Sequence, residues 1–339
     1  MPIADETAQF PPGSAVEPAL VTPWSRALGL RVPVVNAPMG GVAGGRLAAA
    51  VTAAGGLGMI GMGSAATGDA LRRELAHTEP VTGPFGIGLV DWVVARRPEL
   101  LEIAIAARPA LIAISFGEDL SWAARVREHG IRTATQVFTA DHARRAADAG
   151  VEVLVARGLE GGGHGAIEMA TVPLLDAVLA AVDIPVLAAG GIGSAASLAA
   201  VLAAGAGGAW IGTALAACAE SSLSATGRQA MLAADGADTV VTTAVDVALG
   251  YPWPAHFPSR VLRNDFVTAW TGHEDALRAD AGARDTLRAG IAADDPRVLP
   301  VDAGQGVGLV TAVEPVARVL DGWCRGAAEL LAPRTPIGS

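Results

Sequence analysis

The stretch IPVLAAGGIGSAASLAAVLAAGAGGAWIGTA, residues 184–214, decides the fold prediction. It carries no charge, and it is longer than the roughly 18 apolar residues that mark a candidate membrane span. Pro185 and the glycine pairs at 190–191 and 207–208 interrupt it, and such residues end regular elements and open turns. The stretch is therefore predicted to form a buried strand, a helix and a second buried strand.

The same alternation recurs from about residue 32 to residue 220. Strands are predicted at 32–39, 56–63, 84–91, 110–117, 132–138, 151–158, 184–191 and 208–215. Helices are predicted at 46–54, 69–78, 96–107, 120–129, 140–149, 172–181 and 194–204. Continuous apolar strands such as VEVLVA are typical of parallel sheets that helices cover on both faces. Eight such units favour an α/β fold closed into a (β/α)8 TIM barrel.

The remaining segments suggest how the chain is organised around this barrel. Residues 1–25 are expected to form an N-terminal leader, and they lack the basic and apolar regions of a secretory signal. The barrel is assigned to 26–220 and 300–335, with 221–299 as an inserted, mostly helical cap after the eighth strand. Within the cap, YPWPAHFPSRVLRNDF (251–266) either closes over the site or forms an apolar contact in a homodimer.

Composition narrows the possible partners of this 339-residue chain. The formal net charge of −10 disfavours nucleic acid and anionic membranes, which leaves a small-molecule substrate. All 24 basic residues are arginine, so lysine Schiff-base chemistry and a lysine phosphate loop are excluded. The two cysteines, Cys218 and Cys324, form neither a disulfide framework nor a zinc motif. We therefore expect a cytoplasmic protein without a metal.

Phosphate binding is predicted after the last two strands, where α/β barrels commonly hold a phosphate. Glycines expose backbone N–H groups there, and the start of a helix adds positive potential. The candidate residues are Gly190, Gly191, Gly193, Gly212 and Thr213. Two alternatives stay open. The glycines can simply make tight turns, or they can belong to a dinucleotide motif, although no acidic residue follows until Glu220.

A second candidate site follows the sixth strand, in GLEGGGHG at 158–165. Gly162 and Gly163 allow the backbone to approach a flat ligand, and they leave the His164 imidazole at the barrel mouth. A structural role for this histidine is the alternative. The histidines at 77, 129 and 142 are expected on solvated helices, whereas those at 256 and 273 lie in the cap.

The end of the first strand supplies a third candidate, NAPMGG at 36–41. Pro38 fixes a turn next to Ala37, and Met39 can lay a polarisable side chain over an aromatic ring or pack in the core. Gln136 and Ser115 lie on neighbouring strands. Each can bind a ligand in the mouth or satisfy a nearby backbone group.

Four motifs together resemble one family. APMGG at 37–41, GLEGGGHG at 158–165, AAGGIG at 188–193 and IGTA at 211–214 are similar, in order and spacing, to the nitronate monooxygenases. TVVT at 239–242, RVLRN at 260–264 and AGQG at 303–306 extend the resemblance over residues 30 to 325.

The resemblance implies an FMN-dependent TIM barrel that oxidises alkyl nitronates with O2. His164 would be the catalytic residue, orienting the nitronate or removing the α proton of a nitroalkane. Ala37, Pro38, Met39, Gln136, Gly162 and Gly163 would contact the flavin ring, and Gly190, Gly191, Gly193, Gly212 and Thr213 would hold its phosphate.

The chain also departs from the family pattern. Gly88 stands where many members carry Asn, and Gly161 stands where they carry Ala. The alternative function is that of FMN-dependent NAD(P)H reductases acting on enoyl-ACP or quinones, which share the glycine–histidine loop. Inosine-monophosphate dehydrogenase barrels would need a nucleophilic Cys after the sixth strand, and Cys218 instead follows the eighth.

Overall fold

Eight parallel strands form a barrel in the computed structural model, which describes residues 20–78 and 82–333. The barrel strands are β1 (Val34–Asn36), β2 (Gly58–Met62), β3 (Phe85–Val90), β4 (Leu111–Ser115), β5 (Arg132–Val137), β6 (Val153–Arg157), β8 (Val186–Ala189) and β9 (Gly208–Ile211). Their order is β1-β9-β8-β6-β5-β4-β3-β2. The N–H of Leu57 donates to the Val34 carbonyl at 2.9 Å and links the two ends of the sheet. All eight predicted strands and the TIM-barrel fold are confirmed.

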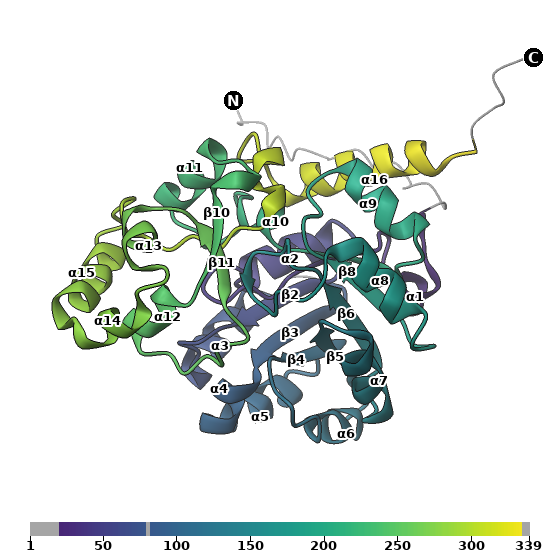
Figure 1. Cartoon of the computed structure of the whole chain (residues 1–339). Helices are drawn as coiled ribbons and strands as arrows, with labels where there is room; N and C mark the ends of the chain where they lie inside the picture. The colour runs from purple at the N-terminus through teal and green to yellow at the C-terminus, as the bar shows by residue number, and fades with distance from the viewer. Residues whose placement is uncertain (1–19, 79–81, 334–339) are drawn as a thin grey trace, which may run out of the picture.

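Helices surround the barrel (Figure 1). They are α2 (Gly45–Ala53), α3 (Gly68–Ala76), α4 (Asp91–Arg96), α5 (Glu99–Ala106), α6 (Trp122–Arg127), α7 (Ala140–Asp148), α8 (Thr171–Leu179) and α9 (Ala195–Ala203). The helix expected at 96–107 is α5, and α4 is an additional short helix that precedes it. Pro98 separates the two, because it cannot donate the backbone hydrogen bond that would continue α4. The charge-free stretch folds into β8, α9 and β9. Over the described residues, no helix has the length and hydropathy of a bilayer span.

A short helix plugs the barrel at the amino ends of its strands. Residues 1–19 of the expected leader lie outside the described residues. Helix α1 (Pro23–Ala27) begins at a Thr22 capping box, and its Trp24 joins the inner core with Val35, Met59 and Trp210. The end of the expected leader is therefore part of the barrel core.

The chain after β9 forms a second layer over the carboxyl ends of the strands. It comprises α10 (Thr213–Ala216), α11 (Ala225–Ala233), η2 (Gly236–Asp238), β10 (Thr239–Thr242), α12 (Ala244–Leu249), β11 (Ser259–Leu262), α13 (Asp265–Trp270), α14 (Glu274–Ala279), α15 (Ala281–Ala292) and η3 (Gln305–Leu309). Helices α12 to α15 share a small apolar core and lie to one side of the barrel (Figure 1). Helix α16 (Val316–Leu331) then packs against α9 and α2.

One strand pairing ties this layer to the barrel. β7 (Gly163–His164) lies in the loop after β6 and pairs antiparallel with β11, opposite Ser259 and Arg260. β11 pairs in turn with β10, so the three strands form a separate sheet. The backbone of His164 is thus an edge of a sheet whose other strands belong to residues 221–299.

Candidate active site

All the residues predicted for the site line one pocket, which opens at the carboxyl ends of the barrel strands. These residues are Ala37, Pro38, Met39, Gln136, Gly162, Gly163, His164, Gly190, Gly191, Gly193, Gly212 and Thr213. Side chains that the motifs did not point to join them, among them Arg157, Trp253, Phe116 and Asp302. The barrel thus gathers four motifs that are far apart in the sequence.

The loops after β8 and β9 present free backbone amides to the pocket. Gly190 and Gly191 adopt φ values of 114° and 65°, which only glycine accepts readily and which turn the chain sharply before α9. The N–H groups of Gly191, Ile192, Gly212 and Thr213 donate to no other group in the described part of the chain. The N–H of Gly193 instead donates to Ser197 Oγ at 3.0 Å. These loops can accept an anion such as a phosphate.

Glycines also let the segment after β1 lie close to its neighbours. An added Cβ on Gly61 would meet the Pro38 carbonyl carbon at 2.3 Å, and one on Gly88 would meet the Pro38 ring at 2.2 Å. Asn36 fixes the segment from below, because its amide nitrogen donates to the Met59 carbonyl at 2.8 Å. Ala37, Pro38 and Met39 form this wall of the pocket.

The loop after β6 wraps around a buried guanidinium. Nη2 of Arg157 donates to the carbonyls of Gly161, Gly162 and Gly163 at 2.8, 3.1 and 2.9 Å. Burial lowers the pKa of Arg157 to about 10, and the charge of Arg260 adds to this effect. An arginine in this position therefore sets the course of the loop that ends at His164.

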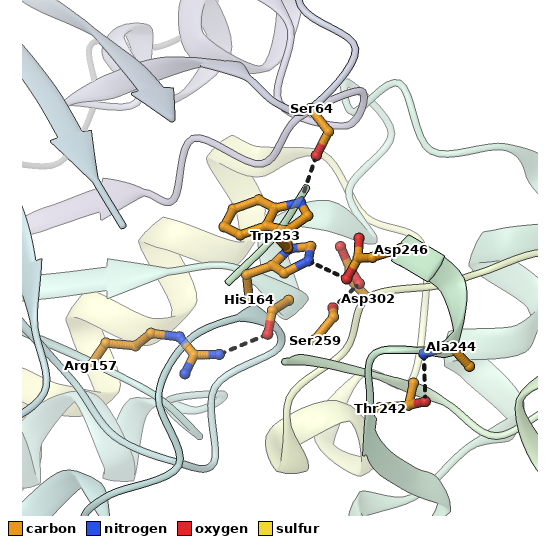
Figure 2. Close-up of polar contacts among 10 residues, drawn as sticks. Ser64, Arg157, His164, Thr242, Ala244, Asp246, Trp253, Ser259 and Asp302 are labelled. Atoms are coloured by element: carbon orange, nitrogen blue, oxygen red, sulfur yellow. Dashed lines mark hydrogen bonds and ion pairs between the residues drawn. The ribbon is translucent and has the colours of Figure 1, made fainter. Parts of the chain in front are cut away.

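His164 is held by groups from the second layer (Figure 2). Its Nε2 lies 2.9 Å from Oδ2 of Asp246, which is 6% exposed on α12. The Trp253 indole stacks on the imidazole with ring centroids 3.6 Å apart and 7° between the planes. Nε1 of Trp253 donates to Ser64 Oγ at 2.9 Å, which anchors the indole to the loop after β2.

Asp302 is the second carboxyl group near His164. Ser259 Oγ donates to it at 2.9 Å. Solvent reaches Asp302 through the pocket, yet the surrounding protein removes enough hydration to raise the pKa of its carboxyl, against the lowering effect of His164.

The segment 251–266 contributes an aromatic wall rather than an outer apolar surface. Phe116 lies edge-on to Trp253 and Phe257, with centroids 5.0 and 5.5 Å apart. Phe116 has φ = 74°, a left-handed conformation that costs about 1–2 kcal/mol for a residue with a Cβ. Trp92 packs behind Trp253 and does not line the pocket. The expected homodimer stays a prediction.

The other candidate histidines and Cys218 lie outside the pocket, whereas Ser115 lines it. The histidines at 77, 129, 256 and 273 are exposed, and His142 is half-buried beside Phe138. Ser115 Oγ accepts from the backbone N–H of Gln136 at 3.1 Å and so satisfies a neighbouring backbone group. Cys218 is buried outside the pocket, and burial raises its pKa to about 12, which is unfavourable for a nucleophile. Over the described residues, no group of three or more potential metal ligands occurs.

Sequence reasoning missed Asp246, Asp302 and Arg157. Asp246 lies 82 residues from His164 on a short helix, and no spacing relates the two. The sequence held one weak indication of Asp302, because this residue directly precedes the AGQG segment. That segment packs on the loop after β6, where an added Cβ on Gly162 would meet Ala303 at 2.6 Å.

A model of one protein family matches almost the whole chain. The family described as nitronate monooxygenase matches residues 22–104 and 94–325. Among curated proteins, a (3aS,4S,5R,7aS)-5-hydroxy-7a-methyl-1-oxo-octahydro-1H-indene-4-carboxyl-CoA dehydrogenase of Mycobacterium tuberculosis is 36% identical over 253 residues, which cover 73% of this chain and 68% of the relative.

Two solved structures share the fold along nearly their full length. FabK from Thermotoga maritima superposes with a TM-score of 0.81 at 29% identity, covering 91% of this chain and 97% of FabK. A nitroalkane oxidase from Streptomyces ansochromogenes superposes with a TM-score of 0.78 at 28% identity, covering 90% of this chain and 98% of the oxidase.

Proposed function

Because the chain belongs to the nitronate monooxygenase family, we propose that it oxidises alkyl nitronates with O2 to a carbonyl compound and nitrite, using FMN. Neutral nitroalkanes are the second substrate class, for which a base must first remove the α proton. The observation that carries the proposal is the placement of an oriented imidazole, His164, in the same pocket as the free amides after β8 and β9.

The pocket fits FMN in three respects. The free N–H groups of Gly191, Ile192, Gly212 and Thr213 suit a phosphate without help from lysine. The wall of Ala37, Pro38 and Met39 can lie close against β2 and β3 because Gly61 and Gly88 have no Cβ. Gln136, Gly162 and Gly163 would complete the ring contacts. When bound, FMN supplies the electron acceptor that oxidation of an electron-rich nitronate requires.

The protein groups supply binding and proton transfer. His164 takes the α proton of a nitroalkane, a task suited to imidazole near neutral pH. Trp253 and Phe116 shield this proton transfer from bulk water. Their apolar surface also suits the alkyl part of the substrate.

Nitrite release and O2 uptake test the proposal directly. The purified protein is incubated with propionate 3-nitronate and, separately, with nitroethane. His164→Asn should keep its flavin and lose nitroethane turnover by about 10²–10⁴-fold, the range of general-base contributions. His129→Asn, at an exposed helical position, is the matched control. Absence of nitrite with both substrates contradicts the proposal.

A second candidate is a flavin-dependent dehydrogenase acting on a CoA thioester. It is favoured by the 36% identity to the mycobacterial carboxyl-CoA dehydrogenase. Under anaerobic conditions, bleaching of the flavin by a cyclic carboxyl-CoA thioester, with none by a nitronate, would select this activity. Bleaching by NADH with subsequent quinone reduction would select the reductase alternative.

A further inference from the structure

We propose that Asp246 is a positioning residue that keeps the proton of His164 on Nε2, so that Nδ1 is the nitrogen that takes the substrate proton. This proposal rests on the proposed function in one respect, the requirement that His164 act as a base. It names the reactive nitrogen of that base and the residue that selects it.

The contact between the two side chains fixes the direction of the hydrogen bond. Asp246 Oδ2 lies 2.9 Å from His164 Nε2, and the side chains are 8% and 16% exposed. An ionised carboxylate can only accept, so the proton of a neutral imidazole must sit on Nε2.

The other ring nitrogen remains available. His164 lines the pocket, whereas Asp246 does not. Nδ1 of His164 makes no hydrogen bond to any of the residues 20–78 and 82–333. With Nε2 committed to Asp246, a substrate in the pocket can exchange a proton only with Nδ1.

The ring cannot readily turn to exchange its two nitrogens. Trp253 covers one face at 3.6 Å, and Ser64 holds the indole in place (Figure 2). A flip of the imidazole would break the bond to a largely buried carboxylate, which leaves a charge without a partner.

One structural unit delivers both members of the pair. His164 is on β7 and pairs with Ser259 of β11, which in turn pairs with β10. Thr242, the last residue of β10, accepts the N–H of Ala244 at its Oγ1 at 3.0 Å and starts helix α12, which carries Asp246 (Figure 2). The sheet therefore fixes the distance between two residues that are 82 positions apart.

Asp246→Asn is the informative variant. It keeps the shape of the side chain, but its amide N–H can donate to Nε2 and move the imidazole proton to Nδ1. The same replacement beside the histidine of a serine-protease triad produces the wrong tautomer and a loss of about 10⁴-fold. Asp275→Asn, at an exposed residue of α14, is the matched control.

The first measurement is the tautomer of His164 in the flavin-loaded protein, by long-range ¹H–¹⁵N correlation with ¹⁵N-labelled histidine. His164→Gln identifies the signal. In the unmodified protein we expect the proton on Nε2, and in Asp246→Asn we expect it on Nδ1. A proton on Nδ1 in the unmodified protein overturns the proposal even if Asp246→Asn does not fold, and it does so whether or not nitronates are substrates.

The second measurement compares two substrates. Asp246→Asn should lower kcat/KM for nitroethane by about 10²–10⁴-fold, and kcat/KM for preformed ethyl nitronate by less than about 10-fold, because only the first needs a base. Asp246→Glu, which keeps the carboxylate, should recover part of the nitroethane activity. An equal loss with both substrates and an unchanged tautomer would show a merely structural role for Asp246 and overturn the proposal.

Discussion

At the scale of single residues, two glycines that depart from the family pattern have a reason in their neighbours. Gly88 faces the Pro38 ring, and Gly161 faces the Arg157 guanidinium, where an added Cβ would lie 3.1 Å from Cζ. Arg157 cannot move away, because it donates to three carbonyls of the same loop. Gly88 is thus explained by Pro38, which lies far from it in the sequence, and Gly161 is explained by Arg157, which lies across the same loop.

Gly88→Ala tests the first of these contacts. The new Cβ would lie 2.2 Å from Cγ of Pro38, so the wall of Ala37 to Met39 must shift. Overpacking of this kind costs about 1–3 kcal/mol, and we expect FMN affinity to fall by at least about 10-fold. Fluorescence titration with FMN measures this affinity. Gly322→Ala, where nothing lies within 4 Å of the added Cβ, should bind FMN unchanged. Equal affinities for all three proteins would refute the proposed wall.

At the scale of elements, the loop from β6 to β7 depends on Arg157. Replacing Arg157 by Gln leaves carbonyls of Gly161 to Gly163 without donors, at about 1–3 kcal/mol for a buried unsatisfied group. We expect the free energy of unfolding, measured by urea denaturation, to fall by this amount. Arg125→Gln, at an exposed ion pair with Glu102, should change stability by less than about 1 kcal/mol.

The same loop allows a test of coupling. Gly161→Ala should destabilise the unmodified protein and be tolerated beside Arg157→Gln, because the guanidinium that the methyl group meets is then absent. A double-mutant cycle measures this coupling, which for residues in contact amounts to about 0.5–3 kcal/mol. Strictly additive changes in the free energy of unfolding would show that Arg157 is not the reason why alanine is unfavourable at position 161.

The elements also show which parts of the structure the sequence can predict. The eight barrel strands repeat one apolar pattern between helices, and that pattern is local. β7 contains only a glycine and a histidine, and its pairing with Ser259 and Arg260 depends on tertiary contact. The glycine loops and His164 were therefore predictable. Asp246 was not, because an aspartate near the start of a short helix is common and only the fold brings it to the imidazole.

At the scale of the whole molecule, α16 and the chain after β9 enclose both cysteines. Cys218 is 1% exposed and Cys324 is 0% exposed, and burial raises the pKa of each to about 12. The reactive thiolate is therefore scarce at about pH 8. We expect neither thiol to react with DTNB in the native protein and both to react together on unfolding in urea.

The Cys324→Ala variant assigns the reacting thiol. Reaction of Cys324 while the rest of the protein stays folded would show that α16 detaches from α9 and α2 as a separate unit. Simultaneous reaction supports one cooperative molecule, in which the helix completes the outer ring of the barrel.

We propose that backbone amides after β8 and β9 hold the phosphate of FMN in the pocket that contains His164. The direct measurement is binding of FMN and of riboflavin, which lacks the phosphate, to the flavin-free protein. Charge-assisted hydrogen bonds of about 1.5–3 kcal/mol each predict at least about 100-fold tighter binding of FMN. Equal affinity for the two flavins, or a protein that binds neither, would contradict this phosphate site.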